Sequence, residues 1–268
     1  MKTILAGTDF SSSSVNACRY AALLAQKLNC KLVIFNLYQT PVYHSNAGLV
    51  GISFSTLKKD SSDKVEKLVE SLRTDFGGIK ISGLSSPGAL SDELADFVSR
   101  HQVAAVVMGL EAKSKLSKFI YGSHGVSIGG KIDAPVIIVP DNYREHRLET
   151  LVLAVDNRGK LTPDSFRGIE KFARNTHANL TLLHVRTPDE LISPAGVTSV
   201  KIGRAQQALV VQNSVSIEAG IKKYCLKNDA DLVAVISKKH SVFYNLFNES
   251  VTKRIAFSAR IPVMAIHE

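Results

Sequence analysis

The sequence predicts an α/β protein with two doubly wound parallel sheets, one in each half of the chain. Three observations lead to this prediction. Short runs rich in Val, Ile and Leu alternate with amphipathic helical segments, as expected for parallel strands covered by helices on both faces. The series of runs occurs twice. The length of 268 residues is also about twice that of a typical domain.

The repeat consists of four pairs of apolar runs. The first two pairs are 147 and 148 positions apart, whereas the last two are 128 and 127 apart. The second half has therefore lost about 20 residues between its second and third strands, where we expect a helix to be shortened or deleted. The paired runs are residues 3–9 with 150–156, 31–36 with 179–184, 104–109 with 232–237, and 134–139 with 261–266.

Each element of the first half follows from its residue spacing. Ser11 to Ser14 supply N-cap candidates for a first helix, because apolar residues then recur every three or four positions. Two further helices show the same spacing. Ile79 and Ile81 indicate a short third strand, Val103 to Met108 a fourth, and a fifth follows Pro135. The apolar positions of the helices are Val15, Cys18, Ala22 and Ala25, then Val65, Leu68, Val69 and Leu72, then Leu90, Leu94, Phe97 and Val98.

A polar connection, residues 141–147, follows the fifth strand. It predicts two domains, residues 1–141 and 148–268.

Composition narrows the classes of function. The basic residues behind the net charge of +9 are scattered and do not alternate with aromatics, which favours a solvated surface over nucleic-acid binding. Three cysteines without CxxC spacing indicate reduced, buried thiols. No apolar stretch is long enough for a membrane span and the N-terminus does not resemble a signal peptide, so we expect a cytoplasmic protein with no membrane partner.

Ligands of open parallel sheets bind at the carboxyl ends of the strands, where the strand order reverses. The candidate binding residues follow three strands of the first half. They are Thr8, Asp9 and Phe10 after the first strand, Asn36 after the second, and Met108 and Gly109 at the fourth.

The segment after the fourth strand carries a resemblance. Gly109 is followed after two residues by Ala112, and after nine more by Gly122 and Ser123. This resembles the G-x2-G-x9-G-[S/T] nucleotide loop of universal stress proteins. With Asp9 and the Ala-Pro-Val-Ile-Ile-Val strand from Ala134, the pattern covers the first half, and the whole chain resembles a tandem universal stress protein.

The resemblance implies five-stranded sheets in the order 3-2-1-4-5, of the adenine nucleotide alpha hydrolase-like kind, with an adenine nucleotide bound across strands one and four. In such a loop, backbone N–H groups and a helix N-terminus hold phosphate. It implies that Asp9 contacts the adenosine part, although Asp9 could instead cap a helix.

Several loop residues have two interpretations. Gly122 and Ser123 match the phosphate position, but Ser123 is equally consistent with a plain N-cap. Ala112 replaces the middle glycine of the pattern. Lys113 and the neighbouring lysines would neutralise phosphate charge or form a solvated loop. His124 adjoins the site or is an exposed residue at a helix start.

The second half keeps Asp156 but has no loop glycine. Residues 237–240 stand where the loop should begin, and Glu249 precedes Ser250 in place of Gly-Ser. A glutamate would repel phosphate, so we expect this half to be a structural or regulatory partner. Lys238, Lys239 and His240 leave open the binding of another anion.

Family topology places each last strand at a sheet edge, and single-domain members are implied to dimerise through it. We therefore expect residues 135–139 and 262–266 to pair within the chain, because bare apolar edges seek partners. Whether the whole chain forms a homodimer is left open.

We expect a stress-response regulatory protein that binds ATP or another adenine nucleotide, with Mg²⁺, in its first half. No paired nucleophile and base, and no metal-ligand spacing, is present. Two alternatives stay open: a slow ATP hydrolase using Asp9 and the loop lysines, and an interaction protein without a nucleotide.

Overall fold

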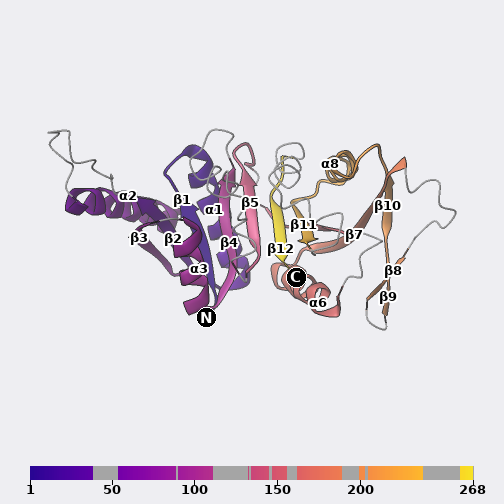
Figure 1. The fold of residues 1–268 in the computed structure, drawn as a ribbon, viewed down its shortest axis with the longest axis horizontal. Coiled ribbons are helices and arrows are strands. Elements are labelled where there is room, and N and C mark those ends of the chain that lie inside the picture. The colour runs from indigo at the N-terminus through magenta and orange to yellow at the C-terminus, as the bar shows by residue number, and fades with distance from the viewer. Residues whose placement is uncertain are drawn as a thin grey trace.

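The computed structural model describes residues 1–38, 54–88, 90–110, 132, 134–144, 147–155, 162–188, 199–202, 205–237 and 260–267. These residues form one ten-stranded sheet with helices on both faces and a separate two-stranded sheet (Figure 1). The order in the large sheet is β10-β7-β6-β11-β12-β5-β4-β1-β2-β3.

The first half forms five parallel strands in the order β3-β2-β1-β4-β5, which confirms the order 3-2-1-4-5. One boundary in the prediction was wrong. The third strand begins at Ile81, after Ile79, and continues through polar residues to Pro87, because all seven residues pair with β2. The elements are β1 (Thr3–Thr8), α1 (Ser12–Leu28), β2 (Lys31–Tyr38), α2 (Phe54–Asp75), β3 (Ile81–Pro87), α3 (Leu90–Arg100), β4 (Val103–Leu110) and β5 (Val136–Pro140).

The second half repeats this order as β10-β7-β6-β11-β12. The described residues between β7 and β10 include a hairpin, β8 with β9, whereas the first half holds the 22-residue α2. Val200 and Ile202 of the hairpin are buried in the same core as α2. The elements are β6 (Thr150–Ala154), α6 (Pro163–Thr176), β7 (Asn179–Arg186), β8 (Ser199–Ile202), β9 (Ala205–Ala208), β10 (Val210–Asn213), α8 (Ile217–Lys227), β11 (Leu232–Ser237) and β12 (Val263–His267).

Two cores lie on opposite faces of the sheet. Alternate strand residues contact α1, α2, α6 and the hairpin on one face and α3 and α8 on the other. No helix among the described residues is long and apolar enough to cross a membrane.

The two halves join through their last strands. β5 and β12 pair antiparallel, with Ile138 opposite Val263 and Ile137 opposite Met264, and they lie side by side at the centre of Figure 1. Ile137 and Met264 are buried. The pairing confirms the prediction that the last strands meet within the chain.

A buried carboxylate anchors the connection between the halves. Asp231, 2% exposed, binds Arg147 Nε at 2.6 Å through Oδ1. Its Oδ2 accepts hydrogen bonds from the backbone N–H groups of Glu149 and Thr150, at 2.8 and 3.0 Å. The carboxylate therefore fixes the start of β6 beside the start of β11.

A second anchor comes from α1. The Asn16 side-chain amide donates to the carbonyls of Pro140 and Tyr143, at 3.2 and 2.8 Å. The chain leaving β5 is thereby tied to the helix that covers the first half.

We expect Asp231→Ala to lower the free energy of unfolding by about 2–4 kcal/mol, because it removes a buried carboxylate that accepts from the backbone N–H groups of Glu149 and Thr150 and pairs with Arg147. Urea denaturation measures the change. Asp164→Ala is the matched control, since its ion pair with Arg167 lies on the surface and its loss should cost less than about 0.5 kcal/mol. Equal effects of the two substitutions would contradict the anchoring role.

Candidate functional site

The candidate site lies where the carboxyl ends of β1, β2 and β4 meet the N-terminus of α1. Thr8 at the end of β1 is in register with Asn36 on β2, and β4 pairs with β1 on the other side. The candidate residues predicted from the sequence lie at this edge wherever the structure describes them. They are Thr8, Asp9, Phe10, Asn36, Met108 and Gly109.

Hydroxyl groups hold the turn after β1. Thr8 Oγ1 accepts from the Phe10 N–H at 3.0 Å and lies 3.1 Å from Ser14 Oγ. Ser14 Oγ in turn accepts from the Asp9 N–H at 3.3 Å. Phe10 has φ 64°, in the left-handed region, which costs a non-glycine residue about 1 kcal/mol. These hydrogen bonds therefore stabilise a turn whose backbone conformation is unfavourable for phenylalanine.

Asp9 orders the start of α1. Its Oδ1 accepts from the Ser11 N–H at 3.1 Å and the Ser11 hydroxyl at 2.5 Å, and Ser11 is the N-cap that accepts from the Ser14 N–H. Asp9 is half-buried, and its Oδ2 has no hydrogen-bond partner among the described residues. One carboxylate oxygen therefore serves the capping role, while the ligand role stays a prediction for the other.

Asn36 supports the turn from inside the protein. It is 5% exposed, its amide nitrogen donates to the Thr8 carbonyl at 2.7 Å, and its Oδ1 accepts from the Ser61 hydroxyl at 2.6 Å. Ser61 Oγ also contacts Ser85 Oγ at 3.0 Å. Asn36 thus links the end of β1 to α2 and β3.

Gly109 allows β4 to touch the first turn of α1. A Cβ at this position would lie 2.5 Å from the Ser13 carbonyl oxygen and 2.8 Å from Ser14 Cα. Close packing is therefore a sufficient reason for this glycine. The neighbouring Met108 is 1% exposed and packs over Gly7, where a Cβ would lie 2.5 Å from its sulfur.

The remaining predicted residues lie outside the described part of the chain. These are Ala112, Lys113, Gly122, Ser123 and His124, together with Asp156, Lys238, Lys239, His240, Glu249 and Ser250. Their roles stay predictions.

Sequence reasoning missed Ser61 and Ser85, which continue the hydrogen bonds of Asn36. Ser61 precedes Val65 by one helical turn and lies with it on the buried face of α2. A polar residue on an apolar helix face was the available signal. Lys64 was also missed; its Nζ lies 5.8 Å from the centre of the Phe10 ring, within the range of a cation–π contact.

The second half repeats the Asn36 link with a different residue. His184 is 3% exposed, and its Nδ1–H donates to the Val155 carbonyl at 3.2 Å, as Asn36 donates to Thr8. Val155, however, stands where the first half has Thr8 and offers no hydroxyl.

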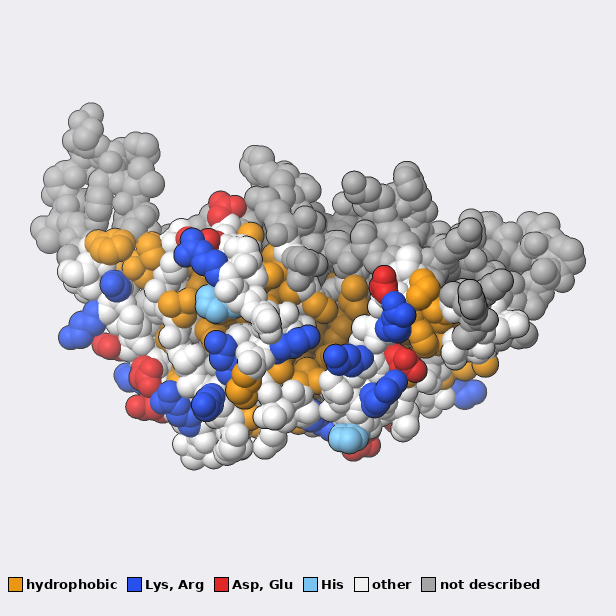
Figure 2. Space-filling model, turned by 90° about the horizontal axis from the view of Figure 1, so that it is seen from below, with side chains coloured by type: hydrophobic (Ala, Val, Ile, Leu, Met, Phe, Trp, Pro, Cys, Tyr) orange, Lys and Arg blue, Asp and Glu red, His pale blue; other side chains and the backbone are white. Residues whose placement is uncertain are grey.

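The described residues form neither a reactive thiol nor a cluster of metal ligands. Burial raises the pKa of the Cys18 thiol to about 12, so it is protonated at neutral pH and is not a nucleophile. No group of three metal-ligating side chains occurs in the ranges that the structure describes. Lys and Arg side chains are spread across both halves of the face in Figure 2, with Asp and Glu among them.

We expect Gly109→Ala to destabilise the protein by about 1–3 kcal/mol, because the added methyl group would push β4 away from the backbone of α1. Urea denaturation measures the loss. Gly77→Ala is the control, since no atom lies within 4 Å of its added Cβ. An unchanged midpoint for Gly109→Ala would show that the two elements separate freely.

Comparison with known proteins agrees with this architecture. The model of the universal stress protein family matches residues 1–140. A universal stress protein of Methanocaldococcus jannaschii is 23% identical over 151 residues, which cover 54% of this chain and 85% of that protein.

One solved structure shows the same fold over the full length. A universal stress protein from Archaeoglobus fulgidus is 17% identical and superposes with a TM-score of 0.66, covering 99% of this chain and 98% of that one. A universal stress protein in complex with cAMP is 22% identical, covers 52% of this chain and 96% of that one, and has a TM-score of 0.38. The family match over half of the chain shows that this protein belongs to the universal stress protein family.

Proposed function

We propose that the protein is a stress-response regulator that binds ATP or another adenine nucleotide at the carboxyl ends of β1 and β4. The observation that carries the proposal is the turn after β1. Hydroxyl groups hold Phe10 in a left-handed conformation, and Asp9 keeps one carboxylate oxygen without a hydrogen-bond partner among the described residues. A fixed carboxylate at a strand end suits recognition of a ribose hydroxyl or an amino group.

The proposal gives the two halves different roles. The first half has the hydroxyl-held turn, while the second has Val155 in place of Thr8 and His184 in place of Asn36. Its loop positions also lack glycine. The second half then acts as the partner that completes the sheet.

Mg²⁺ would enter with the nucleotide, held by its phosphates. The described residues offer no cluster of three metal-ligating side chains, so the proposal assigns Mg²⁺ to the phosphates and Asp9 to the ribose or the base. We propose binding and regulation as the function, without hydrolysis.

We expect calorimetric titration with ATP and Mg²⁺ to show saturable binding at one site per chain. Asp9→Asn should weaken binding by about tenfold or more, because hydrogen bonds to a charged group contribute about 1.5–3 kcal/mol. Asparagine retains an acceptor for Ser11, so the start of α1 is preserved. Asp164→Asn removes an exposed charge from α6 in the second half and should leave the affinity unchanged.

The absence of heat and of any thermal shift at millimolar ATP would contradict the proposal and favour an interaction protein without a nucleotide. Turnover of ATP that disappears in Asp9→Asn would favour the hydrolase alternative.

A further inference from the structure

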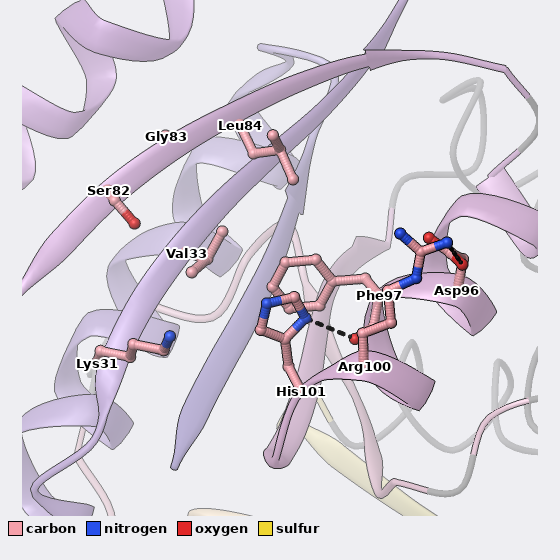
Figure 3. A pocket seen from close by; sticks show the side chains of 9 residues that line it. All are labelled: Lys31, Val33, Ser82, Gly83, Leu84, Asp96, Phe97, Arg100 and His101. Atoms are coloured by element: carbon pink, nitrogen blue, oxygen red, sulfur yellow. Dashed lines mark hydrogen bonds and ion pairs between the residues drawn. The ribbon is translucent and has the colours of Figure 1, made fainter. Parts of the chain in front are cut away.

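A groove of about 440 Å³ lies in the first half between α3 and the strands β2 and β3. Figure 3 shows that Val33 of β2 and Leu84 of β3 contribute from the strands, while Phe97 of α3 and His101, which directly follows α3, project toward them. The volume is in the range of small-molecule sites. The groove uses the amino-terminal part of β2, at Lys31 and Val33, and is separate from the carboxyl-end site at Asn36.

The groove exists because α3 leaves one face of the edge strand uncovered. Phe97 packs over β2, with its ring centre 6.4 Å from that of Phe35. On the neighbouring strand β3, Ser82 is exposed and Leu84 is 39% exposed. The intervening Gly83 faces the opposite side, where a Cβ would lie 2.3 Å from Val65 of α2. Leu84 therefore offers apolar surface to a ligand without being part of a core.

One wall of the groove is a flat aromatic surface. The rings of Phe97 and His101 are stacked, with centres 4.2 Å apart and an angle of 15°. The His101 Nδ1–H donates to the Phe97 carbonyl at 3.0 Å, which fixes the imidazole ring. A planar ring can stack on such a surface at little conformational cost.

The charge of the groove comes from Lys31. Arg100 and Asp96 also line it but form an ion pair of 2.7 Å with each other, on the side of α3 away from the strands in Figure 3. Lys31 has no ion-pair partner among the described residues, and in Figure 3 its ammonium group points toward His101. A cation thus stands at the end of an apolar and aromatic groove.

We propose that this groove binds a small aromatic carboxylate, with its ring between Leu84 and the Phe97–His101 pair and its carboxylate at Lys31. The site is independent of the nucleotide site proposed above, since no residue is shared.

The probe is 2-naphthoate, followed by its fluorescence. The chain contains no tryptophan, so naphthalene emission is free of an indole background. We expect saturable binding to the wild type, and weaker binding of the uncharged 2-naphthylmethanol in competition.

Two groove variants and one control test the location. Lys31→Gln should weaken binding about fivefold, the effect of one partly exposed charge pair. Leu84→Asp should abolish detectable binding, because it replaces the apolar contact with the ligand's ring by a carboxylate in a site that takes an anion. Lys67→Gln, which removes the same charge from the exposed face of α2, should bind like the wild type.

Thermal melting of each variant establishes that the fold is intact. The proposal is overturned if the wild type does not bind 2-naphthoate, if Lys31→Gln and Lys67→Gln weaken binding equally, or if a folded Leu84→Asp binds normally. Asp9→Asn should retain full naphthoate affinity, so the failure of one proposed site is distinguishable from the failure of the other.

Discussion

The antiparallel pairing of β5 with β12 is the contact on which the rest of the architecture depends. Each half ends in an apolar strand that would otherwise expose backbone donors and acceptors along a sheet edge. Pairing these strands turns two five-stranded sheets into one of ten strands. Both cores then run across the junction, because Ile137 and Met264 belong to one and Ile138 and Val263 to the other. The two halves stabilise each other without needing a second chain.

This arrangement explains how the halves can differ at their carboxyl edges. The contact between them uses the last strands, the connection anchored by Asp231, and α1 against α6, where Lys27 Nζ donates to the Thr176 carbonyl at 3.4 Å. The described hydrogen bonds of the turn after β1 lie within the first half. The second half can therefore replace Thr8 by Val155 and Asn36 by His184 while the link between its first two strands is retained.

Much of this fold was predictable because apolar patterning determines which residues enter a parallel sheet. The order of strands came from the family resemblance and agrees with the structure, as does the pairing of the last strands. β3 was underestimated, since an edge strand with one exposed face has no continuous apolar run. The hairpin β8–β9 was missed, because the shorter spacing between the second and third strands of the second half does not indicate which structure replaces the helix.

The candidate site was predictable only in part. A carboxylate after a strand marks the edge at Asp9, yet the hydrogen bonds of Ser61 with Asn36 and Ser85 join elements that are distant in sequence. Gly109 fitted the loop pattern, and the structure adds a packing requirement that the pattern does not contain. The position of Ser61 on the apolar face of α2 signals a buried polar contact, but the spacing does not say which residue it binds.

Native-state hydrogen exchange on the whole chain tests the central claim most directly. The Val106 N–H donates to the Pro135 carbonyl and the Val233 N–H to that of Pro262, so by alternation the amides of Val136, Ile138, Val263 and Ala265 face the junction. If the ten strands form one sheet, these four amides exchange as slowly as those in the centre of β1 and β4 and open only with global unfolding. Exchange at the rate of a free sheet edge, with β1 and β4 still protected, would contradict the account.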